Sequence, residues 1–225
     1  MGWNEWVRNG EVEPSLYAAD FARLGEQVET LLNAGARIFH FDVGDGHFVE
    51  PVTIGPVVLR SIAGLVRERG GILDCHLMVD NPERHIPQFA EAGADSVTAH
   101  YEVCDDPTAL VALAREHGLE AGLAVSPDTN VEDAAAATDG FGVVTCMSVH
   151  PGYSGQAFIP ESLERVRTLR RLLPEGVHVQ VDGGVGPDNV EDVVEAGATL
   201  VVAASAIFGG KDLSDAYRRL ARSFA

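Results

Sequence analysis

The sequence predicts a single (β/α)8 barrel, and a repeated phrase is the first observation behind this prediction. An Ala-Gly-Ala motif ends an expected helix at residues 34–36, 92–94 and 196–198, and a short apolar run follows each time. Glycine readily adopts the left-handed conformation that ends helices, so each phrase is typical of a helix, a stop and a strand. Repetition of this order indicates βα units on a parallel sheet.

The number of such units is the second observation. Eight strands are expected at 13–16, 36–43, 71–79, 96–101, 120–125, 141–149, 177–182 and 200–204. Helices are expected at 20–34, 56–69, 84–92, 107–117, 130–137, 161–173, 188–196 and 212–223. Eight units in 225 residues leave about 28 residues each, which suffices for a small barrel. The alternative is an open doubly wound sheet, but the first strand lacks the G-x-G-x-x-G turn of a dinucleotide-binding half.

No linker, low-complexity tract or charge block divides the chain. We therefore expect one domain over residues 1–225, with a short N-terminal extension at about 1–11. Trp3 and Trp6 lie in this extension, and they are expected to pack either on the barrel of their own chain or on a partner subunit.

The charge balance limits the partners of the protein. Acidic residues outnumber basic ones by 34 to 16, which gives a formal net charge of −18 at pH 7. Such a polyanion repels nucleic acid and anionic lipid, so neither is expected as a partner. The one lysine is Lys211, and a phosphate site must therefore rely on backbone amides and glycines.

A cytoplasmic location is expected from three features. The chain has no apolar run of about 18 residues that could span a membrane, and its N-terminus has no apolar signal core. Cys75, Cys104 and Cys146 are widely spaced and are expected to be free thiols.

Three expected strands carry polar side chains on one face. Because side chains alternate along a strand, one set packs under the helices and the other fills the barrel interior. The inward sets are His40, Asp42 and Gly44 on the second strand, Asp74, His76 and Met78 on the third, and His178, Gln180 and Asp182 on the seventh. Burying such groups costs several kcal/mol unless they are paired or bind a metal.

Four of these groups lie nearest to the carboxyl ends of the strands, where barrel active sites form. They are His40, Asp42, His76 and Asp182. Two imidazoles and two carboxylates suit a divalent ion such as Zn, Fe, Mn or Co, and a self-satisfied polar cluster is the alternative. His178 and Asp74 lie deeper and are expected to complete the core network.

Glycines gather in the loops after the last strands. The segments are Pro151–Gln156 after the sixth strand, Asp182–Val185 after the seventh and Ala204-Ser205 at the end of the eighth. Bare amides in these loops are where barrels commonly bind phosphate. The expected ligand is a small phosphorylated molecule.

The residues described so far resemble those of the ribulose-phosphate 3-epimerase family, barrel enzymes of the pentose phosphate and Calvin pathways. The resemblance covers about residues 12–222, in order and without large gaps. Its motifs are Pro14-Ser15-Leu16 with Ala19-Asp20-Phe21, His40–Val49, Thr53–Pro56, Asp74–Val79 with Asn81-Pro82, Met147–Gln156, Val181–Val185 and Ser205–Phe208.

The resemblance implies roles for individual residues. His40, Asp42, His76 and Asp182 would bind one divalent metal ion, and Asp42 and Asp182 would also be the acid/base pair. Substrate contacts are implied for Ser15, His76, Gly152, Tyr153, Ser154, Gly155, Asp182, Gly183, Gly184, Ala204 and Ser205, with Met78 and Met147 near the enediolate. The family also forms dimers and larger rings, which implies a homo-oligomer.

The implied activity is the interconversion of D-ribulose 5-phosphate and D-xylulose 5-phosphate through an enediolate. Inversion beside a ketone requires one group that removes the α-proton and another that returns a proton to the opposite face. Two alternatives stay open: epimerisation of a related ketose phosphate such as allulose 6-phosphate, and a non-catalytic sugar-phosphate-binding protein.

Departures from the family pattern gather around the expected site, and they leave the choice of sugar open. The family usually has methionine at the position of Gly44, so the cavity is expected to be larger there or to admit water. Other departures are Ser126, His150, Ser154 and Ala204, and the loop that reads Val49-Glu50-Pro51-Val52-Thr53.

Overall fold

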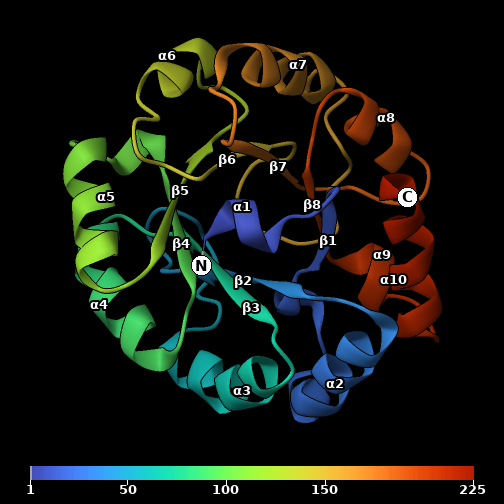
Figure 1. Ribbon diagram of the computed structural model, residues 1–225. Helices are drawn as coiled ribbons and strands as arrows, with labels where there is room; N and C mark the ends of the chain where they lie inside the picture. Colours follow the sequence, from blue (N-terminus) through green and yellow to red (C-terminus); the bar gives the residue numbers. More distant parts are fainter. Residues whose placement is uncertain (1) are drawn as a thin grey trace.

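The computed structural model describes residues 2–225 and has eight parallel strands arranged as a ring within helices (Figure 1). Neighbouring strands follow the order β1-β8-β7-β6-β5-β4-β3-β2. The strands are β1 (Glu11–Pro14), β2 (Ile38–Gly44), β3 (Ile72–Met78), β4 (Ser96–His100), β5 (Glu120–Val125), β6 (Val143–Met147), β7 (His178–Asp182) and β8 (Leu200–Ala203). The barrel prediction is confirmed.

The ring closes between β1 and β2 through one parallel bridge, from Ser15 to His40. Every other pair of neighbouring strands forms a continuous parallel ladder. This closure excludes the open doubly wound sheet. It also brings the first strand against the second, so that the interior is enclosed on all sides.

Helices follow the strands and lie outside the ring (Figure 1). They are α2 (Leu24–Ala34), α3 (Pro56–Glu68), α4 (Pro82–Ala92), α5 (Pro107–Glu116), α6 (Val131–Ala136), α7 (Ser162–Leu172), α8 (Val190–Glu195) and α10 (Leu213–Ala221). Each overlaps an expected helix. Two short helices were not expected: α1 (Trp3–Trp6) and α9 (Ser205–Phe208).

The three Ala-Gly-Ala motifs end helices as predicted. Gly35, Gly93 and Gly197 have φ of 110°, 103° and 111°, a region that residues with a side chain rarely adopt. The alanine after each glycine donates its N–H to a carbonyl five residues back, as in Ala36 to Leu31 at 2.9 Å. This pattern closes the helix end and starts the next strand at once.

The N-terminal segment covers one end of the barrel. In α1, Trp3 and Trp6 are 1% and 6% exposed, and their rings meet edge to face at 5.2 Å. They pack on Ile38, Val143 and Leu200, which lie at the amino ends of β2, β6 and β8. Figure 1 shows α1 across the middle of the ring. The two tryptophans thus pack on the barrel of their own chain, which is one of the two expected arrangements.

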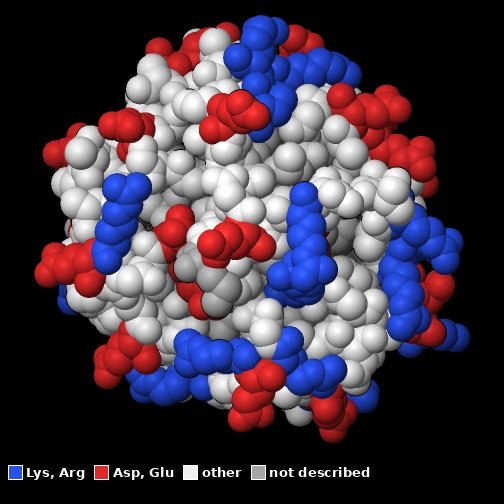
Figure 2. All heavy atoms as spheres, viewed as in Figure 1, with Lys and Arg blue, Asp and Glu red and all other residues white. Residues whose placement is uncertain are grey.

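The surface carries charges of both signs. On the face with α1, acidic and basic side chains alternate without forming one large patch of either sign (Figure 2). Among residues 2–225, no helix is long and apolar enough to cross a membrane.

Candidate active site

A cavity opens at the carboxyl ends of the strands, opposite α1. Its volume is about 50 Å³, and Asp42 and Asp182 both reach it, with side chains 8% and 14% exposed. The wall consists of residues from the strand ends and the loops that follow them: Ser15, Tyr17, Asp42, Met78, Met147, Val149, Pro151, Gly152, Tyr153, Ser154, Gly155, Gln156, Asp182, Gly183 and Gly184.

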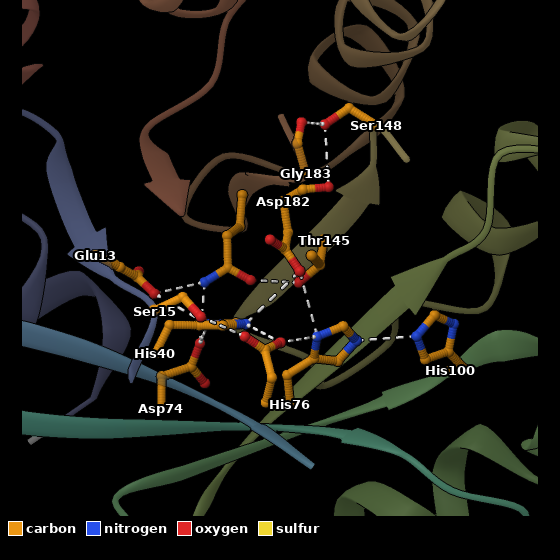
Figure 3. A network of polar contacts seen from close by, with 12 residues as sticks. Glu13, Ser15, His40, Asp74, His76, His100, Thr145, Ser148, Asp182 and Gly183 are labelled. Atoms are coloured by element: carbon orange, nitrogen blue, oxygen red, sulfur yellow. Dashed lines mark hydrogen bonds and ion pairs between the residues drawn. The ribbon is translucent and has the colours of Figure 1, made fainter. Parts of the chain in front are cut away.

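The four predicted ligands form one cluster, in which Asp42 and Asp182 line the cavity and the fully buried His40 and His76 lie behind them. Figure 3 labels His40, His76 and Asp182 in this cluster. His40 Nε2 lies 3.3 Å from Asp42 Oδ1 and 3.8 Å from Asp182 Oδ2. His76 Nδ1 lies 3.1 and 3.4 Å from the same two oxygens. One ligand atom from each residue lies within 4.8 Å of all the others. This is the spacing that a single shared cation requires.

Strand register explains why these side chains converge. Parallel pairing sets Asp42 opposite His76 and His40 opposite Asp74 on β2 and β3. Residues in register share one face of the sheet, so all four point into the barrel. Asp182, the last residue of β7, completes the cluster from another part of the ring.

A deeper polar layer supports the cluster. His40 Nδ1 lies 3.0 Å from Asp74 Oδ2 and 3.4 Å from Glu13 Oε2. Gln180 donates to both of these carboxylates, at 2.8 Å to Glu13 and 2.9 Å to Asp74. Burial raises the pKa of Glu13 to about 7. The expectation that Asp74 joins a core network is met.

His178 does not join that network, and the expectation for this residue is wrong. It is the first residue of β7, so it lies at the opposite end of the barrel from Asp182. Its Nδ1 is 3.1 Å from Thr199 Oγ1, and its Nε2 is 3.2 Å from Asn4 Oδ1. The strand is five residues long, so an inward residue at its start contacts the N-terminal segment instead of the site.

The donor set fits a divalent cation. His40 Nε2 is buried and has no hydrogen-bond partner among residues 2–225, although it points at two carboxylates. Burial opposes a charge on His40, but Asp42, Asp74 and Glu13 outweigh it and raise the pKa of His40 well above its usual value. The carboxylates therefore require positive charge at this point, which a metal ion would supply. Two imidazole nitrogens and two carboxylate oxygens are suitable ligands for Zn, Fe, Mn or Co.

Ser15 orients one of the carboxylates. Its hydroxyl donates to Asp42 Oδ2 at 2.6 Å, which leaves Oδ1 facing the two histidines. Burial opposes ionisation of Asp42, but His40 and His76 outweigh burial and lower the pKa of Asp42. Asp42 is thus held as a carboxylate in a fixed orientation.

The glycine loops form the upper wall. Gly183 and Gly184 have φ of 122° and 64°, and a Cβ on either would lie within 2.5 Å of Val149 Cγ2 or Phe158 N. Ser148 donates to the carbonyls of Asp182 and Gly183 at 3.0 and 2.6 Å, which ties the loops after β6 and β7 together. A side chain at either glycine position would therefore force the loops apart.

Most of the residues implied as substrate contacts lie on this wall. The structure brings together Ser15, Met78, Met147, Gly152, Tyr153, Ser154, Gly155, Gly183 and Gly184. Ala204 and Ser205 instead begin the short helix α9 and are not part of the cavity wall.

Gly44 does not enlarge the cavity, and that expectation is wrong. A Cβ on Gly44 would lie 2.6 Å from the carbonyl oxygen of Pro51 and 2.9 Å from Val49 Cγ2. The loop that follows β2 folds into this space, and Thr53 fixes it by accepting a hydrogen bond from Gly44 N–H at 2.6 Å. The unusual loop and the missing side chain compensate for each other.

Three residues that support the cluster were missed in the sequence, as was Tyr17 on the cavity wall. Glu13 lies in the network below His40, and His100 lies 2.9 Å from His76, with Glu102 beyond it. Alternation on β4 could have found His100, because Ser96, Thr98 and His100 share the inward face. Glu102 follows β4 in a 3₁₀ turn, η3 (Tyr101–Val103), where no periodicity gives its direction.

Fold and site together define the class of protein: a barrel enzyme whose polar site lies at the carboxyl ends of its strands. A sequence model of the ribulose-phosphate 3 epimerase family matches residues 11–208. The chain belongs to this family.

Curated relatives agree with the family. The chain is 42% identical to the ribulose-phosphate 3-epimerase of Mycobacterium leprae over 214 residues, 94% of this chain and 93% of the relative. It is also 42% identical to that of Escherichia coli K12 over 207 residues, 89% and 90% of the two chains.

Solved structures of distant proteins share the fold alone. A 3-hexulose-6-phosphate synthase superposes with a TM-score of 0.74 at 19% identity, covering 96% of this chain and all of the other. The KGPDC protein of Streptococcus mutans superposes with a TM-score of 0.70 at 15% identity, covering 96% and 97% of the two chains.

Proposed function

We propose that the protein is a metal-dependent ketose-phosphate 3-epimerase that interconverts D-ribulose 5-phosphate and D-xylulose 5-phosphate. The observation that carries this proposal is the pair of carboxylates, Asp42 and Asp182, which reach one cavity from β2 and β7. Membership of the family supports the choice of reaction. His40, Asp42, His76 and Asp182 would hold the metal ion.

The two aspartates perform the proton transfers. One carboxylate removes the proton beside the ketone, and the other carboxyl returns a proton to the opposite face. Ser15 holds Asp42 through the 2.6 Å hydrogen bond, and His76 lies 3.4 Å from Asp182, so both groups have fixed positions. A bound divalent cation supplies positive charge that stabilises the developing enediolate.

The phosphate group would lie against the glycine loops. Gly152, Gly155, Gly183 and Gly184 line the cavity without side chains, so backbone amides are accessible there. Lys211 lies outside this cavity, between α9 and α10. Binding by amides matches the scarcity of lysine, and Ser154 and Tyr153 add hydroxyl groups to the same loop.

The proposal includes one divalent metal ion, whose identity is left to experiment. The donor set accepts Zn, Fe, Mn or Co, so metal analysis of the purified protein identifies the ion.

We also propose a homo-oligomer in the cytoplasm. Phe21 and Val57 are 47% and 81% exposed, and such apolar side chains are suited to contacts between subunits.

The test is Asp182→Asn, compared with the parent and with Asp139→Asn, which removes an exposed carboxylate at the far end of the barrel. We expect Asp182→Asn to fold and to lose roughly 10²- to 10⁴-fold in turnover of ribulose 5-phosphate, since a proton-transfer group contributes about that much. Turnover by the control should be unchanged.

Two further outcomes separate the alternatives. Incorporation of solvent deuterium at the substrate α-carbon by metal-loaded parent protein would support catalysis, and its absence with every metal would favour a binding protein. Robust turnover of allulose 6-phosphate with negligible turnover of ribulose 5-phosphate would favour the related sugar. Near-normal turnover by Asp182→Asn would remove Asp182 from the proton-transfer role.

A further inference from the structure

We propose that His100 and Glu102 are positioning residues that fix the ring orientation and tautomer of His76, and so set the metal affinity of the site. The inference rests on the proposed metal site. His76 Nδ1 faces the carboxylate cluster, and its other ring nitrogen, Nε2, lies 2.9 Å from His100 Nε2 (Figure 3). His100 Nδ1 lies 3.1 Å from Glu102 Oε2.

Proton counting selects one arrangement of this chain. Two ring nitrogens that face each other at 2.9 Å share a single hydrogen. If His76 Nδ1 offers its lone pair to a cation, its hydrogen lies on Nε2 and is donated to His100 Nε2. The hydrogen of His100 then lies on Nδ1 and is donated to Glu102. Every nitrogen in the chain has a partner of the right kind.

The charge of Glu102 disfavours the opposite arrangement, although the Ser126 hydroxyl, 3.3 Å from His100 Nδ1, has a role that depends on the tautomer. With the hydrogen of His100 on Nε2, its Nδ1 lone pair would face the Glu102 carboxylate, and two acceptors would repel each other. His76 would then carry its hydrogen on Nδ1, the atom that faces the cluster. Glu102 therefore selects the tautomer of His76 indirectly. It fixes the hydrogen of His100 on Nδ1, and His100 Nε2 then accepts the hydrogen of His76 Nε2.

Glu102 is built to stay ionised. Its Oε1 accepts the Ser126 N–H at 2.8 Å. Burial favours protonation of Glu102, but hydrogen bonds from His100, Thr129 and Ser126 outweigh it and lower its pKa to about 2. The carboxylate is therefore ionised at neutral pH.

Hydrogen bonds anchor the loop that contacts the Glu102 carboxylate. Arg165 on α7 donates to the carbonyls of Ser126, Pro127 and Thr129 at 2.7, 2.8 and 2.7 Å, which fixes the loop that holds Glu102. The Phe48 ring lies 4.7 Å from the His100 ring. His100 is thus held between a fixed carboxylate and an aromatic ring.

The two metal-facing histidines differ in their support. The difference lies in the ring nitrogen that faces away from the four ligand atoms. On His40 this nitrogen, Nδ1, contacts carboxylates directly, whereas on His76 it is Nε2, which reaches a carboxylate only through His100. Loss of a partner that orients a metal-binding histidine typically costs 10- to 100-fold in metal affinity. A change at Glu102 should therefore weaken metal binding although Glu102 touches neither metal nor substrate.

The experiment measures the dissociation constants of Zn²⁺ and Co²⁺ by chelator competition, without substrate, for full-length parent, Glu102→Gln and Asp105→Asn. Asp105 is an exposed acid three residues from Glu102, so its variant controls for charge alone. We expect 10- to 100-fold weaker binding and an altered Co²⁺ absorption spectrum for Glu102→Gln only. Equal constants for the two variants would overturn the proposal.

A second measurement does not depend on the stability of a variant. In Zn²⁺-loaded parent protein with ¹⁵N-labelled histidine, long-range ¹H–¹⁵N spectra report which ring nitrogen carries hydrogen. We expect hydrogen on Nε2 of His76 and on Nδ1 of His100, with His100→Gln used to assign the signals. Hydrogen on Nε2 of His100, or no metal binding by the parent, would also overturn the proposal. Turnover of ribulose 5-phosphate by the parent tests the proposed function separately.

Discussion

Gly44 illustrates how one residue can define the wall of a cavity. The absence of a side chain lets the carbonyl of Pro51 approach to a point 2.6 Å from where a Cβ would stand. Thr53 then pairs with Gly44 in both directions, accepting at 2.6 Å and donating its backbone N–H at 3.1 Å. The loop after β2 is therefore fixed directly beside Asp42.

We predict that Gly44→Ala destabilises the protein by about 1–3 kcal/mol, because the added methyl meets backbone and not a flexible side chain. Urea unfolding measures the effect. Gly64→Ala is the matched control: Gly64 lies inside α3 with open space around its Cβ position, so alanine should stabilise there by roughly 0.5–1 kcal/mol. Equal stability of Gly44→Ala and parent would mean that the loop has another position available.

At the scale of elements, α1 covers the end of the barrel where the strands begin. Its two tryptophans pack where β2, β6 and β8 begin, while the carboxylates lie where β2 and β7 end. Stability and chemistry are therefore assigned to opposite ends of the same strands.

We predict that Trp3→Ala lowers the free energy of unfolding by about 3–5 kcal/mol, since it removes a fully buried aromatic ring. The remaining folded protein should keep its metal affinity. Chemical unfolding and metal titration of the same sample measure both quantities. Arg8→Ala, at an exposed position nearby, should change stability by less than about 0.5 kcal/mol. A small effect of Trp3→Ala would show that α1 is not part of the core.

The sequence could predict those elements whose signals are local. Glycine stops, apolar runs and period-two alternation gave all eight strands, the main helices and the four clustered ligands. The first strand was expected at 13–16 but spans Glu11–Pro14, because Leu16–Ala18 forms a 3₁₀ turn, η1. Residues 20–23 were expected to be helical and instead include another such turn, η2 (Phe21–Arg23).

Contacts between distant residues could not be predicted in this way. Gln180 joins Glu13 across 167 positions of sequence, and His100 joins His76 from the neighbouring strand region. Such partners depend on how far each strand is shifted along its neighbour, and alternation gives only the face of the sheet. The filling of the space beside Gly44 likewise depends on the path of a loop.

At the scale of the whole molecule, the net charge of −18 opposes compactness. Charges of both signs alternate on the face shown in Figure 2, but the total remains strongly negative. Dissolved salt screens such repulsion over about 10 Å at 0.1 M.

We therefore predict that added NaCl raises the melting temperature at pH 7. A rise of roughly 2–4 °C between 0.01 and about 0.3 M would correspond to about 1 kcal/mol. Differential scanning calorimetry measures it, and the same titration near the pI of 4.6 is the control, because net repulsion vanishes there. A melting temperature independent of salt at pH 7 would show that local ion pairs offset the repulsion.

The single bridge between Ser15 and His40 should make this junction the place where the barrel opens locally. Backbone pairing is thinnest there, and side chains take its place: Ser15 holds Asp42, while Gln180 links Glu13 to Asp74. A cation bound by residues of β2, β3 and β7 would link these strands beside the weakly paired junction. Amide hydrogens of β1 and β2 should therefore show the largest slowing of exchange with solvent when the cation binds. Occupancy of the site and rigidity of the barrel would then increase together.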